Sequence, residues 1–197
     1  MEYRVSYRGS SPGGFSLGTV GFLIIANLLV FVITFFFPNS VFLLGLSPAT
    51  FLSRPWTLIT SMFMHAGFGH IFANMLTLYF FGSTLIRIVR EKSFLLIYFL
   101  GGILGGILYI LLAPPFIPVV GASGAVFAVA GALAVLIPRD RVFIFPIPAP
   151  IPLWLAVIGG FAVMSFFPFV AWQAHLGGLL LGLAAGYYFK KRRPYFR

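Results

Sequence analysis

The chain has 197 residues, of which 60% are hydrophobic and only 8% are charged. Because soluble domains usually carry about 25% charged residues, this composition excludes a soluble globular domain and predicts an integral membrane protein. The sequence contains no cysteine, which excludes disulfides, thiol nucleophiles and thiolate metal sites. The net charge of +10 does not indicate a nucleic-acid partner, since the basic residues form short clusters between apolar segments.

Six apolar segments are long enough to cross a bilayer, which takes about 20 residues as a helix. The fold expected is therefore an all-α membrane protein, a bundle of six transmembrane helices within residues 18–190. Basic tails are expected at residues 1–17 and 191–197. The six predicted spans are residues 18–37, 70–86, 94–113, 121–137, 151–167 and 172–189.

The first connection, residues 38–69, is long but too apolar for a mobile linker. Pro48, Arg54 and Pro55 interrupt it, which argues against a further span. We expect a membrane-associated loop with short amphipathic helices in the outer leaflet. Arg54 and Trp56 are suited to the headgroup zone of that leaflet.

The distribution of basic residues predicts the orientation in the membrane. Six spans put both termini on one side, and cytoplasmic termini place 12 of the 13 basic residues on that side. Only Arg54 falls on the other side. The second, fourth and sixth spans then all run from outside to inside.

Four polar residues in these three spans share a similar predicted depth. Depth is counted at 1.5 Å per residue from the basic residues at the cytoplasmic end of each span. Ser123 and His175 then lie roughly 24 and 22 Å from that end, and Asn74 and His70 roughly 20 and 26 Å. All four therefore fall in the outer half of a hydrocarbon core about 30 Å thick. Taken singly, each could be a packing or hydrogen-bonding residue. Their joint depth, and the cost of ionisable groups in a membrane, favour a functional site.

The acidic residues limit the chemistry of such a site. The only ones are Glu2, Glu91 and Asp140, and all three fall in predicted cytoplasmic segments. An aspartyl protease, a Ser-His-Asp triad and a carboxylate proton relay are therefore excluded, and no His-Glu-x-x-His zinc motif is present. A Ser-His dyad remains, with no metal or cofactor expected.

In a Ser-His-Asp triad the carboxylate orients the histidine, so in a dyad the packing of the helices would have to orient it instead. Gly121 and Ala125 on the fourth span, and Gly178 and Gly182 on the sixth, allow the two helices to approach closely. This approach would bring the Ser123 hydroxyl to His175 as a general base. Phe127, one turn after the serine, could pack against the imidazole. The helix N-terminus at Ser123, with His70 and Asn74, could stabilise an oxyanion.

The motifs resemble those of the rhomboid family of intramembrane serine proteases. Gly121-Ala122-Ser123-Gly124 is similar to its Gly-x-Ser-Gly motif, His70 to Asn74 to its His-x-x-x-Asn, and Ala174 to Gly182 to its Ala-His-x-x-Gly-x-x-x-Gly. The chain departs from the family pattern in the first loop, where Thr57 follows Trp56. It also has Phe127 where many members have tyrosine.

The resemblance implies Ser123 as nucleophile, His175 as general base, and an oxyanion hole made by the Ser123 N–H, His70 and Asn74. Gly121, Gly124, Phe127, Gly178 and Gly182 would support the site by packing. Single-span or other transmembrane proteins would be the substrates, cut near the outer side of the membrane. By resemblance, the fifth span and residues 168–171 would form a mobile gate and cap.

Two other functions are possible from the sequence. A non-proteolytic membrane-protein chaperone on the same scaffold predicts a missing serine or histidine, and neither is missing. A small channel or carrier predicts polar residues in both halves of the membrane, whereas the inner half of the fourth span is apolar. The compact six-span form favours a prokaryotic cell membrane, with the site open to the outside. The oligomeric state and the physiological substrate are left open.

Overall fold

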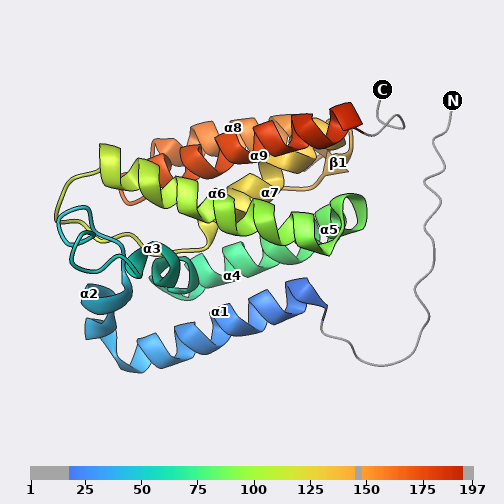
Figure 1. The fold of residues 1–197 in the computed structure, drawn as a ribbon. Helices are drawn as coiled ribbons and strands as arrows, with labels where there is room; N and C mark the ends of the chain where they lie inside the picture. Colours follow the sequence, from blue (N-terminus) through green and yellow to red (C-terminus); the bar gives the residue numbers. More distant parts are fainter. Residues whose placement is uncertain (1–17, 145–147, 193–197) are drawn as a thin grey trace, which may run out of the picture.

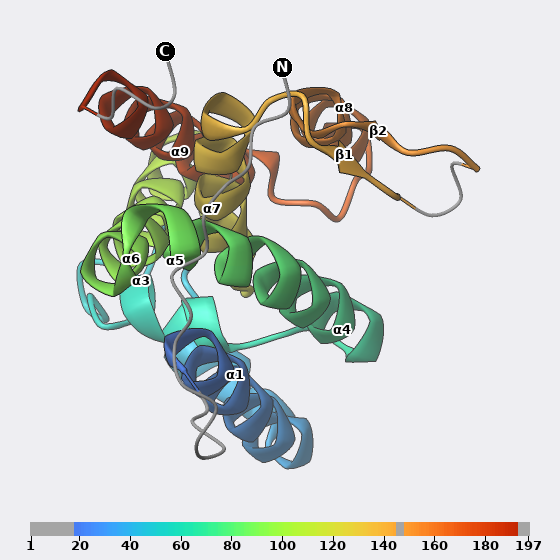
Figure 2. The same cartoon turned by 90° about the vertical axis from the view of Figure 1, so that its right-hand side faces the viewer.

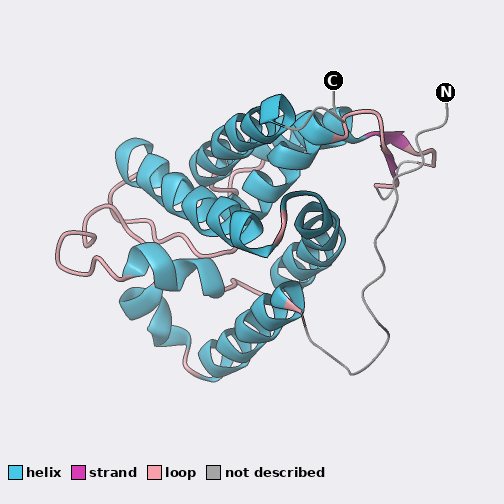
Figure 3. Cartoon of the chain, turned by 45° about the vertical axis from the view of Figure 1, so that its right-hand side comes forward, coloured by secondary structure: helices cyan, strands magenta, loops and turns pink. Residues whose placement is uncertain are grey.

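The computed structural model describes residues 18–144 and 148–192. The predicted tail at residues 1–17 and residues 193–197 of the second tail lie outside the described residues. Within the described part, the chain is mostly helical, with long loops and one pair of very short strands (Figure 3). The predicted all-α membrane fold is confirmed.

The helices follow the predicted spans closely. The first half contains α1 (Thr19–Phe36), η1 (Pro38–Ser40), α2 (Val41–Leu44), α3 (Thr57–Thr60), η2 (Ser61–Phe63), α4 (Phe68–Thr77), the π-helical turn η3 (Leu78–Gly82) and α5 (Ser83–Val89). The second half contains α6 (Glu91–Leu112), α7 (Ser123–Leu136), β1 (Arg141–Val142), β2 (Ile151–Pro152), α8 (Leu153–Ser165) and α9 (Trp172–Arg192).

Three helical segments are long and apolar enough to cross a membrane, namely α1, α6 and the continuous helix from Phe68 to Val89. The apolar helices α7 and α8 are shorter, with 14 and 13 residues. Helix α9 has 21 residues and ends in a basic turn, Lys190 to Arg192. The fourth span is short because the chain before it, from Ala113 to Ala122, is not helical.

Helix α7 occupies the middle of the bundle (Figures 1 and 2). It packs most extensively on α9 and α6, and less on α8, while α1 lies on the opposite side of the bundle against α4 and η3. Eleven of the 14 residues of α7 are buried. A helix that is apolar all round and buried on nearly every side is typical of the core of a helical bundle.

Small residues allow the close contact between α7 and α9. A methyl group added at Gly178 would overlap the carbonyl oxygen of Gly124, and one at Gly182 would overlap that of Ala128. On the other side of α9, a methyl group at Gly177 would lie 2.6 Å from the carbonyl oxygen of Leu104 in α6. Helix α9 is therefore held between α6 and α7 by backbone-to-backbone contact, as small residues permit in membrane helices.

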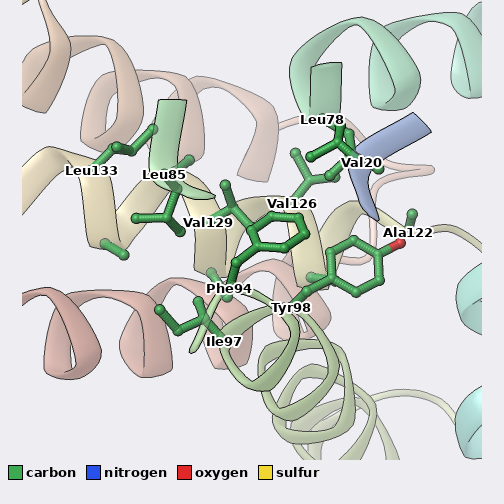
Figure 4. Packing of buried hydrophobic residues seen from close by; sticks show 14 of the residues in the cluster. Val20, Leu78, Leu85, Phe94, Ile97, Tyr98, Ala122, Val126, Val129 and Leu133 are labelled. Atoms are coloured by element: carbon green, nitrogen blue, oxygen red, sulfur yellow. The ribbon is translucent and has the colours of Figure 1, made fainter. Parts of the chain in front are cut away.

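Large side chains fill the space where α6, α7 and the α4–α5 helix meet (Figure 4). Phe94 and Tyr98 of α6 lie beside Val126 and Val129 of α7, with Leu85 of α5 in the same cluster. Phe94, Tyr98 and Leu85 are completely buried. This cluster fixes the helix that carries His70 and Asn74 relative to α7.

The first loop is ordered by its own side chains. Arg54, Trp56 and Thr60 donate hydrogen bonds to the three last carbonyl groups of α2, those of Phe42, Leu43 and Leu44. A helix end without such partners would leave carbonyl groups unpaired. Leu52, at 92% exposure, and Trp56 project outward, as expected of a membrane-associated loop.

Two local features were not predicted. The π-helical turn η3 interrupts the second span, and the Pro-rich connection before the fifth span contains a two-residue antiparallel pairing of β1 with β2. Its register pairs Arg141 with Pro152 and Val142 with Ile151. Proline has no N–H to donate, which limits the pairing to a short ladder.

Candidate active site

The first turn of α7 sets the position of Ser123. Gly121 has a φ of +137°, in the region where glycine is favoured, and its N–H donates to the carbonyl of Ser61 at 2.9 Å. Ala122 then caps the helix, so that Ser123 is its first residue. Within the described residues, the N–H of Ser123 has no acceptor. This N–H is one of the free donors at a helix N-terminus.

His175 comes to Ser123 from α9. It is the fourth residue of that helix, and its Nε2 lies 2.8 Å from Ser123 Oγ. The imidazole is 4% exposed. The glycine contact at Gly178, one turn further along α9, allows the backbones to approach closely enough for this hydrogen bond. The arrangement suits proton transfer from hydroxyl to imidazole, for which the heavy atoms must lie about 2.6–3.2 Å apart.

The imidazole of His175 is held by an aromatic ring. The ring of Phe127 lies 4.6 Å from it, centroid to centroid, at an interplanar angle of 31°. Phe161 of α8 meets the same Phe127 edge-on at 6.0 Å. Among the described residues, His175 Nδ1 has no hydrogen-bond partner. No carboxylate within residues 18–144 and 148–192 orients this base, since Glu91 begins α6 and Asp140 follows α7, both far along their helices from Ser123.

His70 and Asn74 stand on one face of α4, one turn apart. The Asn74 side-chain amide donates to the His70 carbonyl at 2.9 Å, and Asn74 is buried. A methyl group on Gly121 would lie 2.8 Å from both Nε2 and Cε1 of His70, and 3.5 Å from Ser123 Oγ. The structure therefore places the imidazole of His70 close to the Ser123 hydroxyl, at the start of α7.

Several contacts of the site could not be predicted from the sequence. The Ser61 carbonyl that holds Gly121 is a main-chain group, and Phe161 lies in a segment with many aromatic residues. His65, in the loop before α4, is buried and meets His70 edge-on at 5.0 Å. Burial, with a contribution from His70, lowers the pKa of His65 to about 4, so this imidazole stays neutral near neutral pH.

A small cavity adjoins the serine. Its volume is about 20 Å³, enough for one water molecule, and its lining includes Ser61, Gly121, Ser123 and Gly124. Among the described residues, no three His, Asp or Glu side chains lie close enough together to hold a metal ion. The chemistry available here is that of a part-buried hydroxyl, a buried imidazole and free backbone N–H groups.

Fold and site together define an integral membrane protein of packed helices with a Ser-His pair inside the bundle. The family model described as "Rhomboid domain" matches residues 52–192. The chain belongs to the rhomboid family.

Known relatives come from bacteria, fungi and plants. The chain is 33% identical to "Rhomboid protein 1, mitochondrial" of Saccharomyces cerevisiae, over 68% of this chain and 42% of that protein. It is 34% identical to "RHOMBOID-like protein 12, mitochondrial" of Arabidopsis thaliana, over 87% of this chain and 58% of that protein. It is 35% identical to "Rhomboid protease GluP" of Bacillus subtilis, over 66% of this chain and 25% of that protein. The chain thus spans between a quarter and three-fifths of the length of these relatives.

Proposed function

We propose that this protein is an intramembrane serine endopeptidase, with Ser123 as nucleophile and His175 as general base. The observation that carries the proposal is the 2.8 Å contact between Ser123 Oγ and Nε2 of the buried His175. Membership of a family with a relative named a protease supports the same reaction class.

The first step would be attack of Ser123 Oγ on the carbonyl carbon of the scissile peptide. The hydroxyl proton passes to His175 Nε2 as the new C–O bond forms. In serine proteases with a triad, a carboxylate holds the histidine in the correct orientation. Here the ring of Phe127, which lies against the imidazole, and the packing of α9 on α7 would take over this role.

The attack places a negative charge on the former carbonyl oxygen. The free N–H of Ser123 at the start of α7 would donate to this oxyanion, and the helix dipole would favour it. His70 Nε2 and the second N–H of the Asn74 amide are the proposed side-chain donors. In a known serine protease, loss of one such donor costs about 3–4 kcal/mol of transition-state stabilisation.

Collapse of the tetrahedral intermediate breaks the C–N bond, and His175 returns its proton to the leaving amine. A water molecule then attacks the acyl-enzyme, with His175 again accepting a proton. The water-sized cavity beside Ser123 and Gly121 lies where such a water is needed.

The substrates proposed are transmembrane segments of single-span or other membrane proteins, cut near the outer side of the membrane. Both termini would be cytoplasmic, because the basic residues of α5, α6 and the end of α9 gather at one end of the bundle (Figure 1). Ser123 begins α7 at the other end, next to the first loop. The site would therefore open to the outside.

The test is cleavage of a labelled single-span substrate, with a small residue at the outer end of its helix, by purified protein in liposomes. Wild type and Ser53→Ala, a change at an exposed serine of the first loop, are expected to cleave it at one site. Ser123→Ala and His175→Ala are expected to be inactive while remaining folded by circular dichroism. Cleavage by Ser123→Ala at the wild-type rate would rule out the proposed nucleophile.

A further inference from the structure

The two ring nitrogens of His70 have different surroundings. The N–H of Ala66 donates to Nδ1 over 3.4 Å, across the turn that leads into α4. A nitrogen that accepts a hydrogen bond must present its lone pair. In a neutral imidazole, the single ring proton then resides on the other nitrogen, Nε2.

The protonated edge of the ring is the edge that faces the serine. The position of a Cβ on Gly121 lies 2.8 Å from His70 Nε2 and 3.5 Å from Ser123 Oγ. An Nε2–H on this edge is a donor directed at the start of α7. The opposite tautomer would present a lone pair there, which repels an oxyanion instead of binding it.

We propose that the backbone N–H of Ala66 selects the Nε2–H tautomer of His70 and so keeps the oxyanion hole supplied with a donor. This inference rests on the proposed function, in which His70 binds the oxyanion. Ala66 is a positioning residue, since it acts only through the imidazole.

The alternative tautomer is disfavoured at both ends of the ring. A proton on Nδ1 would face the N–H of Ala66, which places two donors against each other and leaves both unpaired. Flipping the ring is hindered by His65, which meets it edge-on at 5.0 Å and 65°. The backbone of His70 is also fixed, because its carbonyl accepts the Asn74 amide at 2.9 Å.

The Ala66 side chain itself is exposed and outside any helix, so position 66 tolerates substitution. Ala66→Pro removes the N–H that donates to His70, and the preceding His65 lies in non-helical chain, as proline requires. Ala66→Ser keeps the N–H and serves as the matched control. Any loss that follows from altered bulk or polarity at this position should occur in both variants.

The experiment is ¹⁵N NMR of histidine-labelled protein in detergent micelles, where the imidazole nitrogen shifts distinguish the two tautomers. The chain has three histidines, and His70→Gln assigns the signal of His70. Wild type and Ala66→Ser are expected to show only the Nε2–H tautomer of His70. Ala66→Pro is expected to show a mixture, with kcat lowered by about two- to tenfold and KM unchanged, the effect of one hydrogen bond.

The inference is overturned if wild type shows the Nδ1–H tautomer, a result that needs no variant to fold. It is also overturned if Ala66→Pro keeps the wild-type tautomer, or if Ala66→Ser loses as much activity as Ala66→Pro. The tautomer is read without substrate. If Ala66→Pro keeps the wild-type tautomer while cleavage depends on Ser123, only this inference is refuted. Cleavage by Ser123→Ala would instead refute the proposed function.

Discussion

A histidine without a carboxylate partner must be oriented by something else, and at the residue scale the candidate is one aromatic ring. Phe127 lies against His175 at 4.6 Å with its ring tilted by 31°, and Phe161 meets Phe127 edge-on. Stacked and edge-on ring pairs each contribute about 0.5–1.5 kcal/mol beyond burial of their area. This is comparable to a hydrogen bond, so packing can hold the imidazole in place.

We therefore predict that Phe127→Leu lowers kcat by about two- to tenfold, the rate equivalent of one lost ring pair. Phe127→Tyr keeps the ring and is expected to stay within twofold of wild type. Phe72→Leu, at an exposed position of α4, is the control for an aromatic residue away from the site. Full activity of Phe127→Leu in the same cleavage assay would show that the ring does not orient His175.

The residues of the site differ in how far sequence could predict them. Ser123, His175, His70 and Asn74 stand out because polar groups are costly in apolar segments, and their common depth follows from helix rise alone. The roles of the Ser61 carbonyl and the Ala66 N–H could not be predicted, since nearly every residue has such main-chain groups. Only the folded loop determines which of them point toward the site. The positive φ of Gly121 likewise depends on the turn that the first loop imposes.

At the scale of elements, the site depends on how closely α9 approaches α7. The Gly178 contact lies one turn below His175, where any side chain would collide with the backbone of Gly124. Backbone cannot move aside as a flexible side chain does. The helices would have to separate, and the hydrogen bond from Ser123 to His175 would lengthen.

Gly178→Ala is accordingly predicted to lower stability by about 1–3 kcal/mol, the usual cost of overpacking, and to reduce activity more than tenfold. Gly160→Ala, in α8 where an added methyl group meets nothing, is the matched control. It should leave activity unchanged and raise the unfolding free energy by up to about 1 kcal/mol, because alanine has a better helix propensity than glycine. Thermal unfolding in micelles and the cleavage assay measure the two effects. Equal behaviour of the two variants would contradict the close-contact account.

A second element feature is the tight turn between α5 and α6. Arg90 has φ 72° and ψ 164°, a conformation that essentially only glycine adopts without strain. Arg90→Gly is predicted to raise the unfolding free energy by about 1 kcal/mol, since such strain costs about 1–3 kcal/mol. Arg87→Gly, which also removes one positive charge but lies within α5, should instead lower it by about 1 kcal/mol. Lower stability of both variants would mean that Arg90 is not strained.

The elements were predictable to within a few residues because each span is a long apolar segment bounded by basic residues, glycine or proline. The second predicted span, residues 70–86, begins at Phe68 and continues to Val89. The π-helical turn η3 could not be predicted, since its residues fit an ordinary helical pattern. The β1–β2 pairing could not be predicted either, because a segment rich in proline argues against strands.

At the scale of the whole molecule, the packed helices hold a part-buried serine and a buried histidine within the bundle. The sequence predicted the helical membrane fold from its apolar segments, and the orientation that the basic residues favour stays a prediction. It could not predict that α7 is the central helix, since α7 is short and its apolar pattern points in no single direction. Helix α7 is central because glycines of α6 and α9 allow both helices to pack closely against it.

The proposed orientation can be tested cleanly because the chain has no cysteine. Single cysteines at Ser53, in the first loop, and at Lys191, near the end of α9, would be labelled in intact cells with a membrane-impermeant thiol reagent. Ser53→Cys should react in intact cells, and Lys191→Cys only after the membrane is opened. The reverse pattern would place the site on the cytoplasmic side.

The most direct test of the central claim asks whether His175 activates Ser123, and it needs no knowledge of the substrate. Purified protein would be treated with a serine-reactive fluorophosphonate, and the adduct located by mass spectrometry. One adduct is expected, on Ser123, and it should be abolished by His175→Ala and left unchanged by Ser53→Ala. An adduct that forms equally well without His175, or on another residue, would contradict the Ser-His dyad.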